Sequence, residues 1–492
     1  MSAGPFLANV LWLAGSLPAA RRFDRALMNP QEAQESWLRA QLRRHANSEF
    51  GREHSFASLT PREFSRTVPL SDYSAIEVRI GKVARGARDV LACGPVTHLA
   101  PTSGSTGARK LIPFNTSLQE AFNAAVGPWM IDLARQRPGI VGGPAYWSIS
   151  PVTEVERSEA AVPIGFADDA DYLGGARAWL VRQALAVSSS IRHVTDTNQF
   201  WSQTLLALLR RRDLRLISVW HPSFLDLLVQ AAVPAWPDLM SSLTADRAAE
   251  LKRIGPYDWP HWWPHLQVVS CWGEQAAEPG WQALKERLPN VLVQPKGLLA
   301  TECVVTIPLG ADRPLAVTSH FFEFLDGDGN VRLAHELEQG SQYEVVVTNG
   351  GGLWRYRLGD MVECTGFVRA TPSLSFLGRA GRVSDLRGEK LSETFVAQVL
   401  SSVFGESRSW AALRPRAKDD VAGYDLLAIT DRADLAQLVD EALLANPHYA
   451  LARRLGQLAP VRLVRVGSDA EARLLQRFNG RLGDAKPLVL LD

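Results

Sequence analysis

The middle of the chain constrains the fold most strongly. Between residues 116 and 264, helical hydrophobic periods alternate with short runs rich in β-branched and aromatic residues, for example at 146–149 and 214–220. Helices that alternate with short strands are typical of α/β domains, in which helices cover the sheet and bury its strands. The sequence therefore predicts an α/β fold for this region.

The remainder of the chain predicts further sheets and a second domain. Runs at 268–272, 304–307 and 344–347 read as strands. After about residue 385, the pattern predicts a smaller α+β unit whose elements lie near 393–403 (helix), 425–429 (strand), 435–444 (helix) and 461–465 (strand). Because 492 residues exceed what one core fills, we expect a large N-terminal domain with mixed sheets, 1–384, and a small C-terminal lid domain, 385–492.

Composition narrows the class of protein. The 53 Lys and Arg against 52 Asp and Glu give a net charge of +1, which argues against nucleic-acid and membrane-surface partners. The four cysteines form no C-x-x-C pair, which favours reduced thiols and a cytoplasmic location. Residues 6–17 are apolar, but the basic Arg21 and Arg22 follow them instead of preceding them. This segment therefore predicts a helix packed on the main domain, not a signal peptide.

A glycine- and hydroxyl-rich run at 101–110, PTSGSTGARK, indicates a phosphate-binding loop. Glycines permit positive φ, so that consecutive backbone N–H groups can converge on an anion, while hydroxyls and cations add further donors. The run lacks the spacing of the P-loop and of the dinucleotide-binding turn. A flexible loop with no ligand is the alternative for such a composition.

Three further segments follow in a fixed order. Ala-Thr-Glu at 300–302 follows an expected strand at 291–294, and WRYRLGD at 354–360 follows another at 343–348. FLGR at 376–379 then leads to GEKL at 388–391. In type and order, the loop and these segments resemble the signature of adenylate-forming enzymes. Within that superfamily the chain is most similar to the GH3 acyl-acid amido synthetases in their bacterial form, and the resemblance covers most of the chain.

The resemblance implies an ATP site with Mg²⁺. The residues that it assigns to ATP binding are Ser103, Gly104, Ser105, Thr106, Gly107, Lys110, Gly273, Glu274, Ala300, Thr301, Asp360 and Arg379. Glu302 would bind Mg²⁺, which prefers carboxylate and water ligands, and Asp360 would accept hydrogen bonds from the ribose. Two positions depart from the pattern: Leu298 replaces an aromatic residue that stacks on adenine, and Cys303 replaces a glycine.

Catalysis also requires a cation, because the carboxylate and the phosphate that it attacks are both negative. The P-K-[ST]-x-x-G-K ending of acyl-CoA ligases is absent. The resemblance instead indicates Lys486, in RLGDAKP, with Lys390 as the competing cation.

The resemblance thus implies an ATP-dependent ligase. It would activate a carboxylic acid as an acyl-adenylate and transfer the acyl group to an amine, which we expect to be an amino acid, releasing AMP and pyrophosphate. Its partners would be small molecules, not nucleic acid or membrane. A thioester-forming acyl-CoA ligase and a non-catalytic nucleotide-binding protein are the two alternatives.

Overall fold

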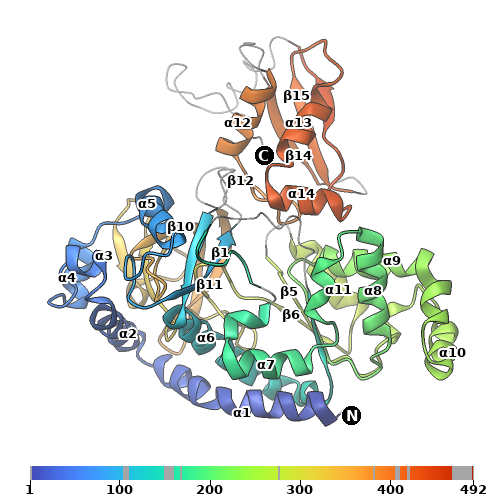
Figure 1. Ribbon diagram of the computed structural model, residues 1–492, viewed down its shortest axis with the longest axis horizontal. Helices are drawn as coiled ribbons and strands as arrows, with labels where there is room; N and C mark the ends of the chain where they lie inside the picture. Colours follow the sequence, from blue (N-terminus) through green and yellow to red (C-terminus); the bar gives the residue numbers. More distant parts are fainter. Residues whose placement is uncertain are drawn as a thin grey trace. The chain divides into compact units, whose positions relative to one another are not determined.

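The computed structural model describes residues 3–102, 110–148, 160–166, 169–274, 277–379, 383–404, 411–417, 421–467 and 490. They form two compact units (Figure 1), of which the first ends at Gly378 and the second begins at Arg379. Each unit has its own hydrophobic core, in keeping with the length of the chain. The domain boundary expected at residues 384 and 385 lies a few residues later and stays a prediction.

The alternating region builds a four-stranded parallel sheet, as expected of an α/β fold. Its strands lie in the order β3 (Ala145–Trp147), β4 (Leu216–Ser218), β5 (Val268–Cys271) and β6 (Leu292–Pro295). The helices between successive strands are α7 (Gly175–Ala184), α8 (Thr197–Leu209), α9 (Pro222–Ser241), α10 (Ala245–Ile254) and α11 (Glu278–Arg287). The short 3₁₀ helices of the unit are η1 (Pro138–Gly142), η2 (Asp169–Leu173), η3 (Ser189–His193), η4 (Trp259–His261) and η6 (Ala334–Glu336).

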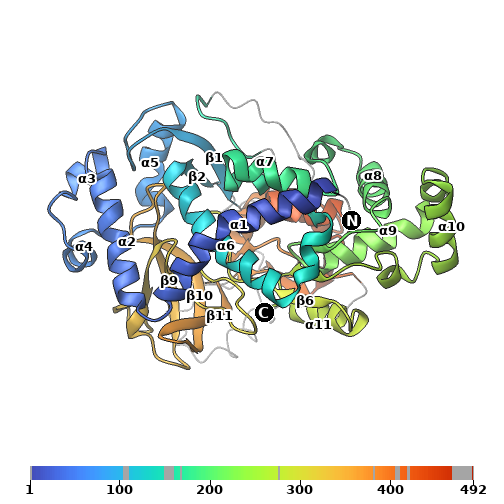
Figure 2. The ribbon, with the colours of Figure 1, turned by 90° about the horizontal axis from the view of Figure 1, so that it is seen from below.

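One face of this sheet is covered by α1 (Ala3–Ala26), α6 (Thr116–Gln136) and α7. Trp12, Met130 and Val181 of these helices share a core cluster with Leu216 and Val268 of the sheet. Figure 2 shows α1 on the outer side of α6 and α7. The apolar N-terminal segment is therefore a helix packed on its unit, as predicted. Within the described residues, no helix is both long and apolar enough to cross a membrane.

A second sheet and the N-terminal helices share the largest core. The five strands lie in the order β11 (Thr371–Arg379), β10 (Tyr356–Val368), β9 (Gln342–Thr348), β7 (Phe321–Leu325) and β8 (Val331–Leu333). A separate hairpin is formed by β1 (Val96–Thr102) and β2 (Lys110–Asn115). Trp354, 1% exposed, lies at the centre of this core, where its ring contacts Phe50, Phe56 and Phe64.

Between Pro30 and Thr67 the chain forms three helices, which are separated by two helix caps. The structure has α2 (Pro30–His45), α3 (Glu49–Glu53), α4 (Pro61–Thr67) and, beyond them, α5 (Tyr73–Ala84). Ser48 Oγ accepts a hydrogen bond from the Gly51 N–H, and Thr60 forms a capping box with Glu63. Because a cap residue supplies the hydrogen bonds that the first turn lacks, it starts a new helix even within one amphipathic pattern.

The strand expected at 304–307 is wrong. These residues are buried, but their backbone pairs only through single bridges, from Val304 to Leu299 and from Thr306 to Leu315. An apolar run can be buried by packing from several sides without joining a sheet.

The second unit has the mixed α+β composition that was predicted. Its elements are β12 (Val383–Ser384), β13 (Leu391–Ser392), α12 (Glu393–Phe404), β14 (Ala411–Arg416), β15 (Gly423–Ala428), α13 (Leu435–Leu443), α14 (Pro447–Arg454) and β16 (Arg462–Arg465). The sheet order is β14-β15-β16. The four expected elements are confirmed, whereas β14 and α14 were not predicted.

Candidate functional site

The hairpin β1–β2 fixes both ends of the predicted phosphate loop. Its antiparallel register pairs Thr102 with Lys110, so the connection between them begins and ends at one point. Lys110 Nζ lies 5.7 Å from the centroid of the Tyr73 ring, and the Tyr73 hydroxyl accepts a hydrogen bond from the Leu111 N–H at 2.9 Å. The loop residues Ser103, Gly104, Ser105, Thr106 and Gly107 lie outside the described residues.

The segment from Ala300 to Cys303 is a tight turn. The Ala300 N–H donates to the Cys303 carbonyl at 2.8 Å, and the Cys303 N–H donates back at 3.3 Å, so that Thr301 and Glu302 form the tip. Asn349 Nδ2 donates to the Glu302 carbonyl at 2.7 Å, which ties the turn to the end of β9. The backbone thus holds Thr301 and Glu302 while both side chains remain partly exposed.

Asp360 is held at an irregularity of β10. The register between β10 and β9 shifts between Arg357 and Met361, and Gly359 within this bulge has φ of 74°. Bulges redirect side chains and are common beside functional sites. Asp360 is 3% exposed. Arg357 next to the bulge is paired with Glu344 through two hydrogen bonds, of 3.0 and 2.6 Å, which gives it a structural role.

Glu302 and Asp360 lie in one neighbourhood, although 58 positions separate them in the chain. Both carboxylates act on the thiol of Cys303, whose pKa burial raises well above its ordinary value and whose charged form the two carboxylates disfavour further. Carboxylate oxygens are suited to Mg²⁺ and to sugar hydroxyls. The two carboxylates therefore fit the predicted binding of Mg²⁺ by Glu302 and of the ribose by Asp360. Both roles stay predictions.

Glu274, assigned by resemblance to the adenine site, is engaged by other protein groups. Arg313 Nη2 lies 3.1 Å from its carboxylate, and Ser375 Oγ and the Phe376 N–H donate to it at 2.9 and 3.4 Å. Burial raises the pKa of Glu274, and the Arg313 charge opposes that rise. Gly273 precedes it in a close approach, because a Cβ there would lie 2.9 Å from Pro295 Cβ.

Two further candidate residues, Arg379 and Lys390, belong to the second unit. Arg379 is the last residue of β11 and the first of that unit. Lys390 has φ of 47° and lies near His448, whose pKa burial and this cation lower to about 4. Lys486 lies outside the described residues. Its role and that of Lys390 therefore stay predictions.

Sequence reasoning missed Lys296, which follows β6 and is only 4% exposed. Its ammonium donates to Ser218 Oγ at 2.6 Å and to Ser270 Oγ at 3.3 Å. The rings of Trp129 and Trp220 lie 5.4 and 5.7 Å away. Ligands of parallel sheets bind beyond the carboxyl ends of the strands, where Lys296 lies. A signal was available in its position two residues after the strand predicted at 291–294.

Two models of known protein domains match stretches of this chain. The model of the GH3 family N-terminal domain matches residues 19–254, and that of the GH3 family central domain matches residues 314–379. Together the two matches span more than half of the chain.

Two relatives in plants are similar over most of their length. GH3.10 of Oryza sativa subsp. japonica is 26% identical over 469 residues, which cover 88% of this chain and 93% of the relative. The indole-3-acetic acid-amido synthetase GH3.15 of Arabidopsis thaliana is 24% identical over 426 residues, which cover 74% and 70%.

Solved structures share the fold. AtGH3.15 acyl acid amido synthetase in complex with 2,4-DB has a TM-score of 0.66 at 19% identity, covering 98% of this chain and 95% of that one. A 2-hydroxyisobutyryl-CoA ligase in complex with 2-HIB-AMP and CoA has a TM-score of 0.51 at 13% identity, covering 96% and 91%.

Proposed function

Because the chain belongs to the GH3 family, we propose that it is an ATP-dependent acid–amine ligase. The carboxylate of an acid attacks the α-phosphate of ATP, pyrophosphate leaves, and an acyl-adenylate forms. The nitrogen of an amine, in our proposal an amino acid, then attacks the acyl carbon. An amide forms, AMP leaves, and the amine nitrogen loses a proton. The names of the relatives, which are acid-amido synthetases, support this reaction.

The observation that carries the proposal most directly is the placement of the two motif carboxylates, Glu302 at the tip of a turn tied to the end of β9 and Asp360 beside the bulge of β10. Glu302 would hold Mg²⁺, which when bound neutralises phosphate charge, and Asp360 would accept the ribose hydroxyls. The hairpin end at Lys110 would supply a cation to the phosphates. Since phosphoryl transfer depends mainly on positioning and on charge neutralisation, these residues suffice for nucleotide binding, while Lys486 would approach the reacting carboxylate.

We also propose a cytoplasmic location. The four cysteines Cys93, Cys271, Cys303 and Cys364 are all free, and burial raises the pKa of each thiol. Free and weakly acidic thiols are suited to a reducing compartment.

The test is carboxylate-dependent exchange of pyrophosphate into ATP over a panel of aromatic and aliphatic acids. Exchange with at least one acid is expected, and product mass with an amino acid or coenzyme A then separates the amide from the thioester. ATP binding without exchange for any acid would favour the non-catalytic alternative. Thioester as the main product would favour the acyl-CoA ligase, whose fold the chain shares.

A further inference from the structure

The face of the parallel sheet beneath α6 changes character toward the carboxyl ends of its strands. One row across this face consists of Ala145, Leu216, Val268 and Leu292, which pair in register and pack in the apolar cluster of α1, α6 and α7. Side chains of a strand return to the same face every second residue. The next row on this face is therefore Trp147, Ser218, Ser270 and Gln294, and three of these four side chains are polar.

A polar row inside a helix-covered sheet requires hydrogen-bond partners. Trp129 on α6 supplies one, because its indole N–H donates to Gln294 Oε1 at 2.8 Å. Lys296, two residues beyond Gln294 and so on the same face, supplies the donors to Ser218 and Ser270. These groups make one connected site at the carboxyl ends of β4, β5 and β6.

Gln294 carries a donor that the described residues leave without a partner. Its side chain is 2% exposed, and its Nε2 forms no hydrogen bond with any described group. An indole N–H can only donate, so Trp129 fixes the carbonyl oxygen of Gln294 and leaves the NH₂ group directed elsewhere. A buried amide donor with no acceptor costs about 1–3 kcal/mol. The donor therefore points to an acceptor that a ligand would bring.

The charge of Lys296 indicates which acceptor fits best. An ammonium group has three donors and no acceptor, and two indole rings near it stabilise its charged form. Trp220, one of these rings, is 52% exposed, so the site has an aromatic wall that faces solvent. In a water-poor site, an anionic acceptor interacts with such a cation much more strongly than a neutral one.

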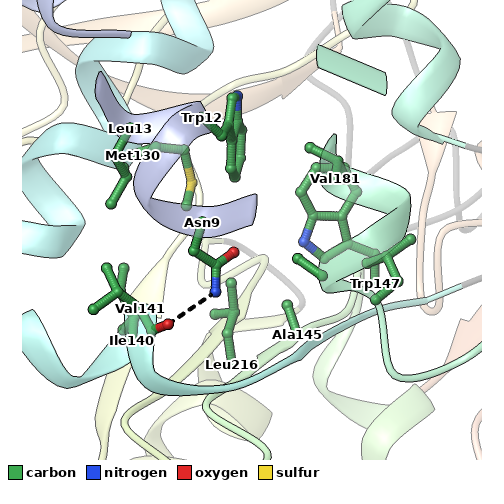
Figure 3. Close-up of a pocket in the computed structure, with 12 residues that line it drawn as sticks. Asn9, Trp12, Leu13, Met130, Ile140, Val141, Ala145, Trp147, Val181 and Leu216 are labelled. Atoms are coloured by element: carbon green, nitrogen blue, oxygen red, sulfur yellow. Dashed lines mark hydrogen bonds between the residues drawn. The ribbon is translucent and has the colours of Figure 1, made fainter. Parts of the chain in front are cut away.

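An apolar cavity lies beside this site. It has a volume of about 30 Å³ and is lined by Trp147 of the polar row together with side chains of α1, α6 and α7, including Trp12 and Met130 (Figure 3). Its lining is almost entirely apolar, and the amide of Asn9, which also lines it, donates to the carbonyls of Val141 and Gly143. A cavity of this size holds only a small apolar group, so it adds apolar surface beside the donors without holding a whole ligand.

We infer that Lys296 and Gln294 bind a second anionic group, a carboxylate, at the distal end of the acyl substrate. The acid that this chain activates is therefore a dicarboxylic acid, of which only one carboxylate is adenylated. This inference rests on the proposed ligase function and names its substrate class.

The reacting carboxylate belongs elsewhere. It must meet the nucleotide, whose proposed ligands Glu302 and Asp360 act on the thiol of Cys303. Lys296 instead lies at the carboxyl end of β6, where it donates to Ser218 and Ser270. In our proposal the acyl chain connects these donors to the nucleotide site.

The test compares matched acids in the exchange assay: hexanoate with adipate, and benzoate with terephthalate. In the full-length protein, kcat/KM for the dicarboxylate should exceed that for its monocarboxylate at least about tenfold in one pair. Lys296→Met should abolish this preference, because removing one partner of a buried charge pair costs at least about thirtyfold. The variant should lower kcat/KM for the dicarboxylate far more than for the monocarboxylate of the same pair. Gln294→Leu should reduce the preference less, and Lys285→Met, at an exposed lysine of α11, should not change it.

The inference is overturned if neither dicarboxylate is preferred by the wild-type protein, a result that requires no variant to fold. It is also overturned if Lys296→Met lowers both members of a pair equally, since Lys296 would then act on the reacting end. Absence of exchange with every acid contradicts the proposed function instead. In that case, quenching of tryptophan fluorescence by adipate and terephthalate tests the proposed binding site directly. The site is supported if the dicarboxylates bind more tightly than the monocarboxylates and if Lys296→Met removes this difference. Equal binding of dicarboxylates and monocarboxylates to the wild-type protein refutes the site.

Discussion

Glu389 in the second unit should make stability depend on pH in a direction unusual for a carboxylate. It is fully buried, and burial followed by the nearby charge of Asp385 raises its pKa from 4.5 to about 7. It accepts hydrogen bonds from the N–H groups of Leu386 and Arg387, at 2.7 and 2.6 Å, and from the hydroxyl of Tyr424. The two backbone hydrogen bonds favour the ionised form, but burial outweighs them.

The folded protein and the unfolded chain bind the proton of Glu389 with different affinity. Between pH 4.5 and 7 the folded protein keeps the proton on Glu389, whereas the unfolded chain has released it. Unfolding therefore releases a proton, and the free energy of unfolding falls as the pH rises through this range. A pKa difference of this size corresponds to a loss on the order of 3 kcal/mol, complete above pH 7.

His448 acts in the opposite direction and partly hides the effect. Burial, followed by the charge of Lys390, lowers its pKa from 6.5 to about 4. Its contribution to stability is therefore lost as the pH falls from 6.5 through 4. The wild-type profile alone cannot isolate Glu389, so the quantity to measure is the difference between the wild-type protein and Glu389→Gln at each pH.

The assay is urea denaturation of the full chain from pH 4.5 to 8. A hydrogen-exchange pulse at one fixed pH follows each equilibration, and peptides of β15 report on the second unit. Relative to Glu389→Gln, the wild-type protein should lose about 3 kcal/mol across this range. Glu441→Gln, at an exposed carboxylate of α13, is the matched control and should give no such trend. A wild-type-minus-Gln difference that is flat, or that grows with pH, refutes the reasoning.

Three further outcomes are expected. Asp360→Asn should raise the KM for ATP in the exchange assay at least about tenfold, since it weakens a charge-assisted hydrogen bond, and an unchanged KM would contradict the ribose assignment. Lys486→Ala should slow adenylation about a hundredfold or more, measured as single-turnover pyrophosphate release, and equal rates would remove the lysine from the reaction. Arg313→Met should lower the free energy of unfolding by about 2 kcal/mol or more, because it leaves the buried Glu274 without its cation; urea denaturation would show a smaller loss if the pair were unimportant.

Local patterns in the sequence predicted much of the fold. The strands β5, β6, β9 and β15 and the helices α12 and α13 carry their own periodicity or β-branched runs. The run at 304–307 has the same composition, yet its burial comes from packing between several elements. Nothing within four residues of sequence distinguishes these two cases.

Some residues of the candidate site can likewise be predicted from local sequence, and others cannot. Glu302 and Asp360 are found through short motifs, because the turn and the bulge that hold them are local. Lys296 was missed because its partners come from three other segments: Ser218, Ser270 and Trp129 reach it only through the strand register and the position of α6. A lysine after a predicted strand is usually solvated, and only the register reveals that this one is not.

The helix α1 has a consequence for how substrate preference can diverge among relatives. Asn9, Trp12 and Leu13 line the apolar cavity, but the match to the family begins at residue 19. Mutations in this stretch can reshape the space beside Trp147 without touching any motif by which the family is recognised. If the proposed acid reaches this space, two proteins that are alike in every shared motif could differ in the acids they accept, and a phylogeny built from the matched region alone would not record when that difference arose.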